Sequence, residues 1–427
     1  MEIKAMYRKI VKDSFPDTIT IDMGGQKLIF RKKVWNIYDE DEGVNVERGL
    51  RYGENPDQPA AMYELINGNL VMGDVRFLDP ERGLVSKIKE HDMLQVGKHP
   101  GKINLTDIDN ALNILKFLDK KPACAIMKHN NPSGVAYGST SAEAFEKAFW
   151  ADRIAAFGGA VIFTRKVDKE TAQIMAQNYF EVVCAPDYDG EALDILKKWK
   201  NLRILKIEEI ERLHEYKFKR FIDFKTLIDG GLIIQESQPF RIRSKEDLKP
   251  AETHYKGKTY KINRLPTEKE YEDMLFGWYV ETGVTSNSVL FVKDEVTISI
   301  GTGEQDRVGV VEIAIFKAYK KFIDKEVFKK FGVPYAVFKL EAERGERDLK
   351  ALMEIEEYAK ETCAELKGSI VCSDGFFPFR DGVDAAIREG VTGVIQPGGS
   401  ERDYEVIEAC NEKNVTMVFT GQRLFKH

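Results

Sequence analysis

Residues 128–134 (KHNNPSG) combine a cation, a titratable imidazole and two amides within one short run. They follow an apolar, strand-length segment (PACAIM), so Lys128 and His129 stand where a buried strand would end, and residues 132–134 would turn the chain. An imidazole can accept and return a proton near neutral pH, and an ammonium can stabilise a developing oxyanion. The run therefore predicts acid–base chemistry at a strand end, although a Lys-His pair in that position is often only a solvated edge.

Other stretches carry side chains that suit a phosphate, an amide contact or a flat ring. Arg51, in the rigid loop LRYGENPDQP, offers a planar fork for phosphate, whereas an isolated loop arginine is more often solvated. Asn287, in the run VTSNSVLFV, is an amide that needs hydrogen-bond partners if it is buried, and a turn-stabilising role is its alternative. Phe376 and Phe379, in the run SDGFFPFRD, suit either a flat ligand or core packing.

The elements that must position these side chains alternate between helical and strand patterns. The patterns predict helices at 141–149, 169–179, 383–389 and 403–412, and apolar strand segments at 155–163, 181–188, 393–396 and 415–420. This rhythm predicts a mixed α/β fold. Because it occurs in both halves of the chain, it also predicts a divergent duplication.

Composition divides the chain into four parts. Residues 1–49 read as a helix followed by a hairpin around Gly24-Gly25, and this extension is too short for a large core of its own. Residues 50–234 form a first α/β unit, and residues 235–265 are a polar linker interrupted by prolines. Residues 266–427 form a second α/β unit, whose first helix is predicted to start with a capping box between Thr267 and Glu270.

The overall composition is that of an ordinary globular protein. The chain has 427 residues, of which 43% are hydrophobic and 31% charged, enough for two or three domains. A net charge of −6 argues against a general nucleic-acid-binding protein. No apolar stretch approaches the roughly 18 residues of a membrane helix, and the amino terminus lacks the apolar core of a signal peptide. We therefore expect a cytoplasmic protein with no membrane or nucleic-acid partner.

The cysteines form no CxxC pair, and no histidine stands near them at metal-ligand spacing. The sequence therefore predicts neither a metal site nor a disulfide framework, and most of these residues are expected to be small buried hydrophobes. The five are Cys124, Cys184, Cys363, Cys372 and Cys410.

Three motifs, LRYGENP, KHNNPSG and SDGFFPFRD, occur in one order within residues 50–427. Together they closely resemble the AICAR transformylase family, whose members formylate 5-aminoimidazole-4-carboxamide ribonucleotide (AICAR) in purine biosynthesis. The resemblance implies two cytidine-deaminase-like α/β units. The chain lacks room for the IMP cyclohydrolase half to which this enzyme is usually fused, so a stand-alone form is expected, with a separate IMP cyclohydrolase elsewhere.

The resemblance also implies roles for the residues at matching positions. His129 would act as general base, with Lys128 and Asn287 stabilising the tetrahedral intermediate. The residues expected to contact the nucleotide are Arg51, Tyr52, Asn104, Gly158, Glu181, Phe376, Phe379 and Arg423, and those expected to contact the folate are Arg307, Val308 and Asp381. Judged by residue type alone, the stretch around Asn104 fits a plain helix cap at Thr106 or Asp107, and a terminal Arg423 would fray.

The implied reaction is formyl transfer from 10-formyltetrahydrofolate to the amine of AICAR, giving the formamide FAICAR and tetrahydrofolate without a covalent intermediate or a catalytic metal. Members of the resembled family are homodimers with active sites at the interface, and some bind a structural K⁺. Glu304 and Asp306 replace the Gln and Ser that are usual in the folate loop, so another one-carbon donor, formate with ATP, is an alternative. A non-catalytic purine-nucleotide-binding protein is a second alternative, whereas a zinc deaminase is excluded by the lack of a ligand set.

Overall fold

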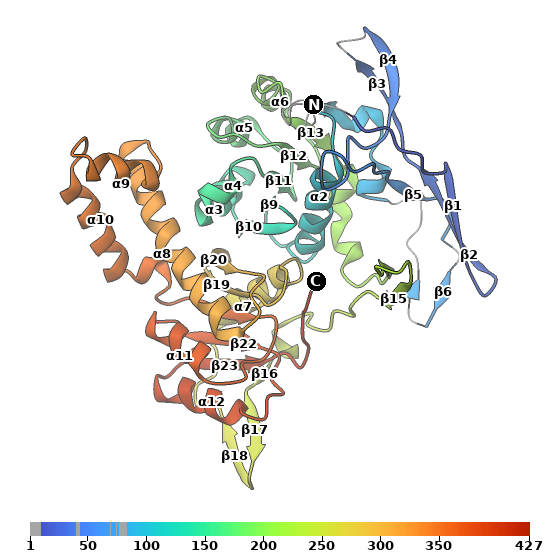
Figure 1. Cartoon of the computed structure of the whole chain (residues 1–427). Coiled ribbons are helices and arrows are strands. Elements are labelled where there is room, and N and C mark those ends of the chain that lie inside the picture. Colours follow the sequence, from blue (N-terminus) through green and yellow to red (C-terminus); the bar gives the residue numbers. More distant parts are fainter. Residues whose placement is uncertain (1–9, 40–42, 69, 74, 77–82) are drawn as a thin grey trace. The chain divides into compact units, whose positions relative to one another are not determined.

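The computed structural model describes residues 10–39, 43–68, 70–73, 75–76 and 83–427. The chain forms two compact units, coloured by sequence in Figure 1. The first unit contains residues 1–122 and 158–240, and the second contains residues 123–157 and 241–427. Both units pack helices on β-strands, which confirms the predicted α/β class. None of the helices in the described ranges combines the length and apolar character needed to cross a bilayer.

These unit boundaries differ from those expected from composition. Residues 123–157, expected in the first α/β unit, group with the second half of the chain because their strand β10 pairs with β20, at Ala136 and Val296. Much of the segment expected to be a linker also belongs to the second unit, where it forms short strands. The helix expected at the amino end involves residues 1–9, which lie outside the described ranges.

The first unit is built around a parallel βαβαβ segment. Strands β11, β12 and β13 run parallel, and β8 adds an antiparallel edge to β13. The strands are short and buried, as apolar strands covered on both faces must be. The bounds are β8 Met93–Gln95, α2 Lys102–Leu115, β11 Ala160–Phe163, α5 Lys169–Met175, β12 Val182–Ala185, α6 Gly190–Leu196 and β13 Arg203–Lys206.

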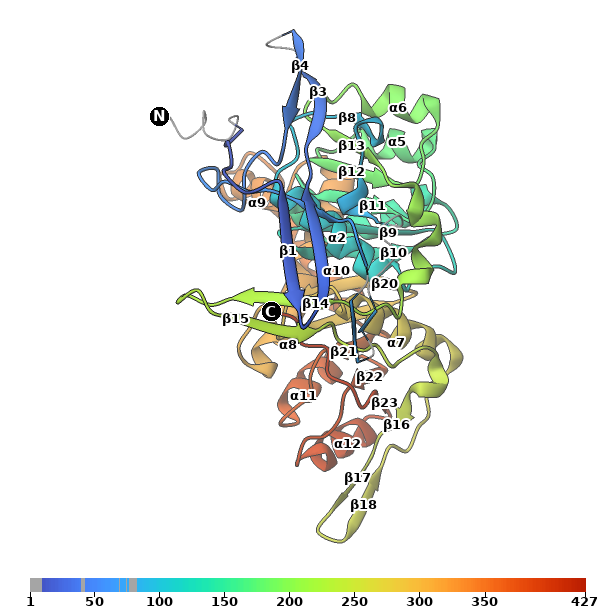
Figure 2. The same ribbon diagram turned by 90° about the vertical axis from the view of Figure 1, so that its right-hand side faces the viewer.

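The remainder of the first unit consists of small antiparallel pieces. The predicted hairpin around Gly24 and Gly25 is confirmed, and both glycines have positive φ (64° and 88°), which two-residue hairpin turns require. Figure 2 shows β14 and β15 as a separate two-stranded ribbon. The bounds are β1 Thr18–Met23, β2 Gln26–Lys32, β3 Trp35–Asp39, β4 Val44–Arg48, β5 Tyr63–Leu65, β6 Val71–Met72, β7 Val75–Arg76, η2 Val85–Lys87, η3 Glu90–Asp92, η4 Glu208–Tyr216, β14 Ile222–Thr226 and β15 Leu232–Glu236.

The second unit contains a larger mixed sheet with the order β16-β23-β22-β21-β19-β20-β10-β9. Strands β21, β22 and β23 are parallel and are joined through α11 and α12, whereas the remaining pairs are antiparallel. The bounds are β9 Ala123–Lys128, β10 Asn131–Tyr137, α3 Ser141–Ala151, α4 Arg153–Ala156, η5 Lys245–Asp247, β16 Lys249–Pro250, β17 Glu252–Tyr255, β18 Lys258–Lys261, α7 Glu268–Glu281, β19 Val289–Lys293, β20 Val296–Gly301, α8 Arg307–Phe331, α9 Tyr335–Glu343, α10 Leu349–Glu361, η6 Cys363–Glu365, β21 Ile370–Ser373, α11 Asp381–Arg388, β22 Gly393–Gln396, α12 Asp403–Glu412 and β23 Thr416–Phe419.

Helices cover both faces of this sheet because side chains alternate along each strand. Val289 and Phe291 of β19 join the core that includes residues of α8, α11 and α12. On the other face α7 lies so close that a side chain at Gly277 would overlap Sγ of Cys372. Four of the five cysteines are buried, as predicted. The predicted capping box at the start of α7 is also confirmed, since Thr267 and Glu270 exchange side-chain and backbone hydrogen bonds.

One run of elements occurs twice in the chain. A helix, a two-stranded hairpin, another helix and a parallel βαβαβ segment follow one another from α2 to β13 and again from α7 to β23. This repetition supports the duplication inferred from the sequence rhythm. It also places the hairpins β9–β10 and β19–β20 at corresponding points of the two repeats, and both hairpins lie beside predicted site residues.

Candidate functional site

The Lys128-His129 run forms a tight hairpin turn between β9 and β10. His129 and Asn130 are its two central residues, and both have left-handed φ (54° and 62°). The turn therefore lies at His129 and Asn130, and the predicted turn at residues 132–134 is wrong, because Pro132 pairs with Met127 as part of β10. The His129 side chain is exposed, while Nζ of Lys128 donates to the carbonyl oxygen of Phe157 at 2.8 Å. An imidazole on such a turn can reach a ligand without unfolding a strand.

Asn131 ties this turn to the loop that contains Asn287. Its Oδ1 accepts a hydrogen bond from the backbone N of Thr285 at 2.9 Å, and Oγ1 of Thr302 lies 3.3 Å from the same oxygen. Sequence reasoning assigned Asn131 no role. The only signal in the sequence was its place beside the Lys-His pair.

Asn287 has its side-chain amide fixed on both sides. Oδ1 accepts from Nη2 of Arg307 at 3.0 Å, and Nδ2 donates to the carbonyl oxygen of Gln305 at 2.8 Å. Its backbone N donates to the carbonyl oxygen of Glu304 at 3.2 Å. Two residues predicted for the site, Asn287 and Arg307, therefore lie in direct contact, and the second N–H of the Asn287 amide can serve a ligand oxygen.

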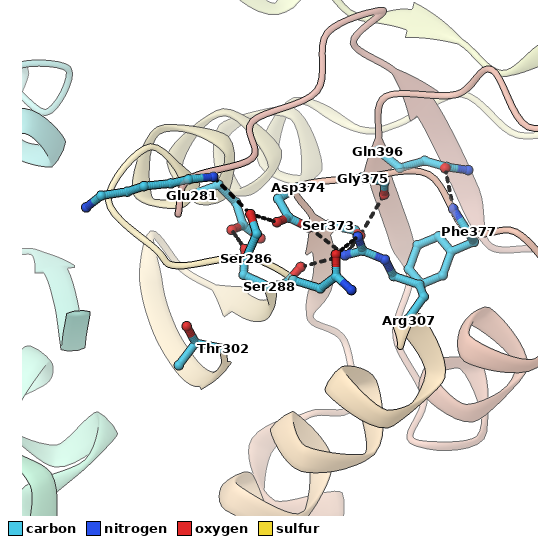
Figure 3. Close-up of polar contacts among 12 residues, drawn as sticks. Glu281, Ser286, Ser288, Thr302, Arg307, Ser373, Asp374, Gly375, Phe377 and Gln396 are labelled. Carbon is cyan, nitrogen blue, oxygen red and sulfur yellow. Dashed lines mark hydrogen bonds and ion pairs between the residues drawn. The ribbon is translucent and has the colours of Figure 1, made fainter. Parts of the chain in front are cut away.

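Arg307 is a buried side chain that hydrogen-bonds to several neighbouring residues (Figure 3). Its Nη1 donates to Asp374 Oδ1 at 2.5 Å, to Ser373 Oγ at 3.0 Å and to the carbonyl oxygen of Ser288 at 3.0 Å. Asp374 is fully buried, so this ion pair is shielded from solvent. Val308, also predicted to contact the folate, is half-buried in the next position of α8.

Glu304 and Asp306, which replace the Gln and Ser usual in the resembled family, have local structural roles. Asp306 is the N-cap of α8, and its carboxylate accepts from the backbone N of Gly309. A serine would fill the same capping position, so this replacement preserves the start of the helix. Glu304 Oε1 accepts from the backbone N of Gln305 at 2.9 Å.

The carboxyl-terminal tail is docked on the Asn287 loop. The backbone N of Ser286 donates to the carbonyl oxygen of Lys426 at 2.9 Å, and the backbone N of Leu424 donates to that of Asp374 at 2.9 Å. Ser286 Oγ also donates to Asp374 Oδ2 at 2.5 Å. Arg423 is exposed, with its guanidinium 4.1 Å from the ring centroid of Phe425. Residue type alone predicts that this tail frays, but its backbone is held by these hydrogen bonds.

Glu281 is a buried acid next to this cluster that sequence reasoning missed. It is fully buried, and its Oε2 accepts from Oγ of Ser288 at 2.5 Å. Burial, together with the charge of Asp374, raises the pKa of Glu281 well above its ordinary value, while Ser288 and Arg307 oppose that shift. Its position at the end of α7 gave no sign that it faces the sheet.

The SDGFFPFRD run contains one phenylalanine that packs in the core and two that are exposed. Phe377 is fully buried and fills the core, whereas Phe376 and Phe379 are 40% and 50% exposed. The core-packing alternative therefore applies to Phe377 and not to the two phenylalanines predicted for the site. Asp381, the first residue of α11, is also exposed.

The first unit brings several predicted nucleotide contacts together. Nδ2 of Asn104 donates to Glu181 Oε2 at 3.2 Å, and Oδ1 of Asn104 accepts from the backbone N of Gly101. Gly101 is the N-cap of α2, so the cap expected at Thr106 or Asp107 is wrong. Nη2 of Arg51 donates to Tyr52 Oη at 2.9 Å.

The backbone around Gly158 supports the same group. Gly158 has a positive φ of 72°, and its N donates to the carbonyl oxygen of Tyr179 at 2.9 Å. The backbone N of Glu181 donates to the carbonyl oxygen of Gly159 at 3.0 Å. The glycine pair therefore lies against the strand segment that carries Glu181.

Arg203 completes this group and was missed in the sequence. It is 1% exposed, and its Nη1 lies 3.3 Å from the carbonyl oxygen and 3.5 Å from Oε2 of Glu181. Burial, and then the charge of Arg51, lower the pKa of Arg203 to about 10. Burial also lowers the pKa of His99 to about 4, so this neighbouring imidazole is neutral. Arg203 thus interacts electrostatically with one guanidinium, that of Arg51, and one carboxylate, that of Glu181, and two cations beside a single anion suit an anionic ligand.

The predicted residues therefore fall into two groups, one in each unit. The first unit holds Arg51, Tyr52, Asn104, Gly158 and Glu181, and the second holds Lys128, His129, Asn287, Arg307, Val308, Phe376, Phe379, Asp381 and Arg423. Across the described ranges, no group of three or more His, Cys, Asp or Glu side chains is placed to hold a metal ion.

Comparison with known proteins covers most of the chain. A family model described as "AICARFT/IMPCHase bienzyme" matches residues 5–317. Proteins named "Bifunctional purine biosynthesis protein PurH" are 37% identical in Aquifex aeolicus over 400 residues (93% of this chain, 63% of that protein) and 36% identical in Caldicellulosiruptor saccharolyticus over 378 residues (88% and 59%). The counterpart in Persephonella marina is 37% identical over 379 residues (88% and 59%). The chain thus spans about three fifths of the length of these relatives.

Proposed function

Because the chain belongs to the AICARFT/IMPCHase bienzyme family, we propose that it catalyses formyl transfer from 10-formyltetrahydrofolate to the exocyclic amine of AICAR. The products are FAICAR and tetrahydrofolate, formed in the biosynthesis of IMP. The observation that carries the proposal is the link from the exposed His129 turn, through Asn131, to the fixed amide of Asn287. This link supports the proposal, because the proposed base and the proposed oxyanion donor then lie on connected loops of one unit.

The chemistry requires removal of a proton from a weak nucleophile. The amine of AICAR is conjugated with its ring and carboxamide, so it attacks the formyl carbon only as it loses a proton. His129 accepts that proton. The intermediate oxyanion is met by the Lys128 ammonium and by the Nδ2 hydrogen of Asn287 that Gln305 does not use. The carbon–nitrogen bond to the folate then breaks, and the folate nitrogen takes a proton.

The remaining predicted contacts divide between the two substrates. Arg51, assisted by Arg203 and by Arg423, binds the phosphate, and Glu181 with Asn104 accepts and donates hydrogen bonds at the ribose. Phe376 and Phe379 face the flat ring of the substrate, and Asp381 with Val308 contacts the folate. Arg307 acts on this site through Asn287, because its guanidinium is committed to partners inside the unit.

We propose that the protein functions without a structural K⁺, because protein donors surround Asp374. The Asp374 carboxylate already accepts from Arg307 and from Ser286, and Nζ of Lys426 donates to the carbonyl oxygen of Gly283 at 3.3 Å. Each of these oxygens therefore already accepts a hydrogen bond from the protein. We propose that the protein works as a homodimer with active sites at the interface.

A spectrophotometric transfer assay tests the proposal. The His129→Ala variant should lose turnover by orders of magnitude while its affinity for AICAR changes little, because the base acts only in the chemical step. His91→Ala, at another exposed histidine, is the matched control. Wild-type turnover in His129→Ala would exclude His129 as the base. Running the same assay with formate and ATP separates the alternative donor, and tight AICAR binding without turnover for either donor would identify a non-catalytic binding protein.

A further inference from the structure

The ribbon formed by β14 and β15 in the first unit exposes many large apolar side chains. Phe224 is 37% exposed, Leu232 52%, Ile233 51%, Ile234 45%, and Ile228 at the tip fully. Within the described residues, β14 and β15 pair only with each other. A two-stranded ribbon is marginally stable in water unless another strand or an apolar surface covers it. An exposed apolar ribbon of this kind marks an interaction surface.

The register assigns most of the large apolar side chains to one face. Directly paired residues share a face, and the pairs are Phe224 with Ile234 and Thr226 with Leu232. The opposite face carries Asp223 with Gln235 and Lys225 with Ile233. The ribbon therefore has one mainly apolar face and, on the other face of β14, two opposite charges separated by one residue.

The hydrogen-bond pattern shows which backbone groups point outward from β14. Leu227 donates to Gly231 at 2.8 Å, and Ser237 donates to Phe221 at 2.8 Å. Because alternate residues of an antiparallel ladder face the partner strand, residues 221, 223, 225 and 227 face β15. The N–H and C=O of Phe224 therefore point away from the ribbon, toward the outer edge of β14.

This edge is complementary to itself. If β14 pairs antiparallel with β14 of a second copy about a two-fold axis at Phe224, the two Phe224 residues exchange both backbone hydrogen bonds. Asp223 of each copy then lies opposite Lys225 of the other, on the same face. The same operation on β15 would place Ile233 opposite Gln235 and Leu232 opposite Glu236, without charge pairing. The sequence of β14 thus favours β14 as the joining edge.

We propose that β14 pairs edge to edge with β14 of a second copy of this chain, forming a four-stranded sheet across the dimer. The mainly apolar faces of the two ribbons then form one continuous surface on one side of this sheet. A lipid surface is a poorer occupant, because the charged pair of β14 has no net positive charge to attract anionic headgroups. The inference rests on the ribbon itself and not on the proposed reaction.

Charge reversal tests the pairing by sedimentation of the full chain over a dilution series. Asp223→Lys or Lys225→Glu alone places like charges opposite each other twice and should weaken the dimer about tenfold or more. The double variant restores opposite charges and should recover wild-type association. Lys200→Glu, at another exposed lysine of the first unit, controls for the change in net charge. A monomeric wild type, or a double variant no stronger than either single variant, would overturn the proposal.

Cysteine cross-linking provides a second, geometric test. Phe224→Cys places two thiols at directly opposed positions, where Cα atoms in a hydrogen-bonded pair are about 5.5 Å apart, within disulfide range. Ile228→Cys is the control, because residue 228 is more exposed yet lies away from the axis. Rapid oxidation of Phe224→Cys to a covalent dimer, with slow oxidation of Ile228→Cys, is expected. Equal rates, or faster oxidation of Ile228→Cys, would show that exposure alone governs the reaction and would contradict this pairing, whether or not formyl transfer is observed.

Discussion

Oδ1 of Asn287 accepts a hydrogen bond from Nη2 of Arg307 at 3.0 Å, and Nη1 of the same guanidinium is held by the fully buried Asp374 at 2.5 Å. One planar guanidinium thus bonds both side chains, so the position of Asn287 depends on that of Asp374. Arg307, predicted to contact the folate, thus also holds the side-chain amide of Asn287, the proposed oxyanion donor. Such orientation matters because catalytic donors must be held within fractions of an ångström of their working position.

Arg307→Lys should lower kcat by about 100-fold with a smaller change in KM, because a lysine keeps the charge but cannot hold Asp374 and Asn287 with one planar fork. Steady-state kinetics well below the melting temperature measure this, with the melting temperature recorded in parallel. Arg388→Lys, at an exposed arginine in the last turn of α11, is the control. An unchanged kcat would show that Asn287 does not depend on the guanidinium.

Arg203→Met should raise the KM for the nucleotide about tenfold while kcat stays near that of the wild type, because one of the two cations beside Glu181 is lost. Methionine of similar length fills the space, and removal of the repulsion with Arg51 offsets the lost ion pair, so the protein should stay folded. Titration of nucleotide affinity by calorimetry checks the effect. Arg212→Met, at an exposed arginine, should change neither quantity; a normal KM in Arg203→Met would limit Arg203 to packing.

His99 should make the protein less stable in acid. In the neutral form its Nε2–H donates to the carbonyl oxygen of Gly49 at 2.5 Å, and burial lowers its pKa to about 4. Between pH 6.5 and 4 the unfolded chain binds a proton that the folded chain does not, so the free energy of unfolding falls as pH falls, by about 3 kcal/mol in total. His99→Gln keeps a donor and should flatten this part of the profile in urea denaturation. The exposed His91→Gln should not; equal profiles for all three proteins would contradict the prediction.

Glu281 should make the free energy of unfolding depend on pH in the opposite direction to His99. Its pKa in the folded protein is raised, so above the ordinary pKa of glutamate the folded chain retains a proton that the unfolded chain has lost. The free energy of unfolding therefore falls as pH rises, until the folded-state pKa is reached. Glu281→Gln should remove this pH dependence. The free energy of unfolding of the variant, relative to that of the wild type, should therefore be higher at pH 8 than at pH 5. Thermal melts at both values measure the difference, with Glu272→Gln, exposed on the same helix, as the control. A wild type whose advantage over Glu281→Gln grows with pH would refute it.

Local signals predicted two elements to the residue, whereas the helix expected at 169–179 ends at Met175 and the strand expected at 155–163 begins at Ala160. The helix at 403–412, the strand at 393–396 and the capping box of Thr267 and Glu270 all occur as expected, because caps and apolar periodicity act within a few residues. The turn after β9 was misplaced because Pro132 usually breaks a strand. Here β10 accommodates it next to a bulge, where the register shifts between Pro132 and Gly134.

The candidate site was only partly visible in the sequence. The Lys-His run and Asn287 stand out because their residue types occur beside turns, and the structure links them through Asn131. Arg203 and Glu281 could not be found in this way. Both are charged residues whose burial depends on strands and helices far away in the chain, and nothing in their immediate neighbours distinguishes them from solvated residues.

Helix α8 begins at Arg307 and ends at Phe331, about 36 Å away along its axis, and α9 and α10 follow it. These last helices enclose a small core of their own, formed by Val327, Phe338, Ala342, Leu352 and Ile355. Such a satellite core can open without disrupting the sheet. Amide hydrogens of α9 and α10 should therefore exchange with deuterium through a local opening of low free energy. Those of β19 and β21 should exchange only through global unfolding.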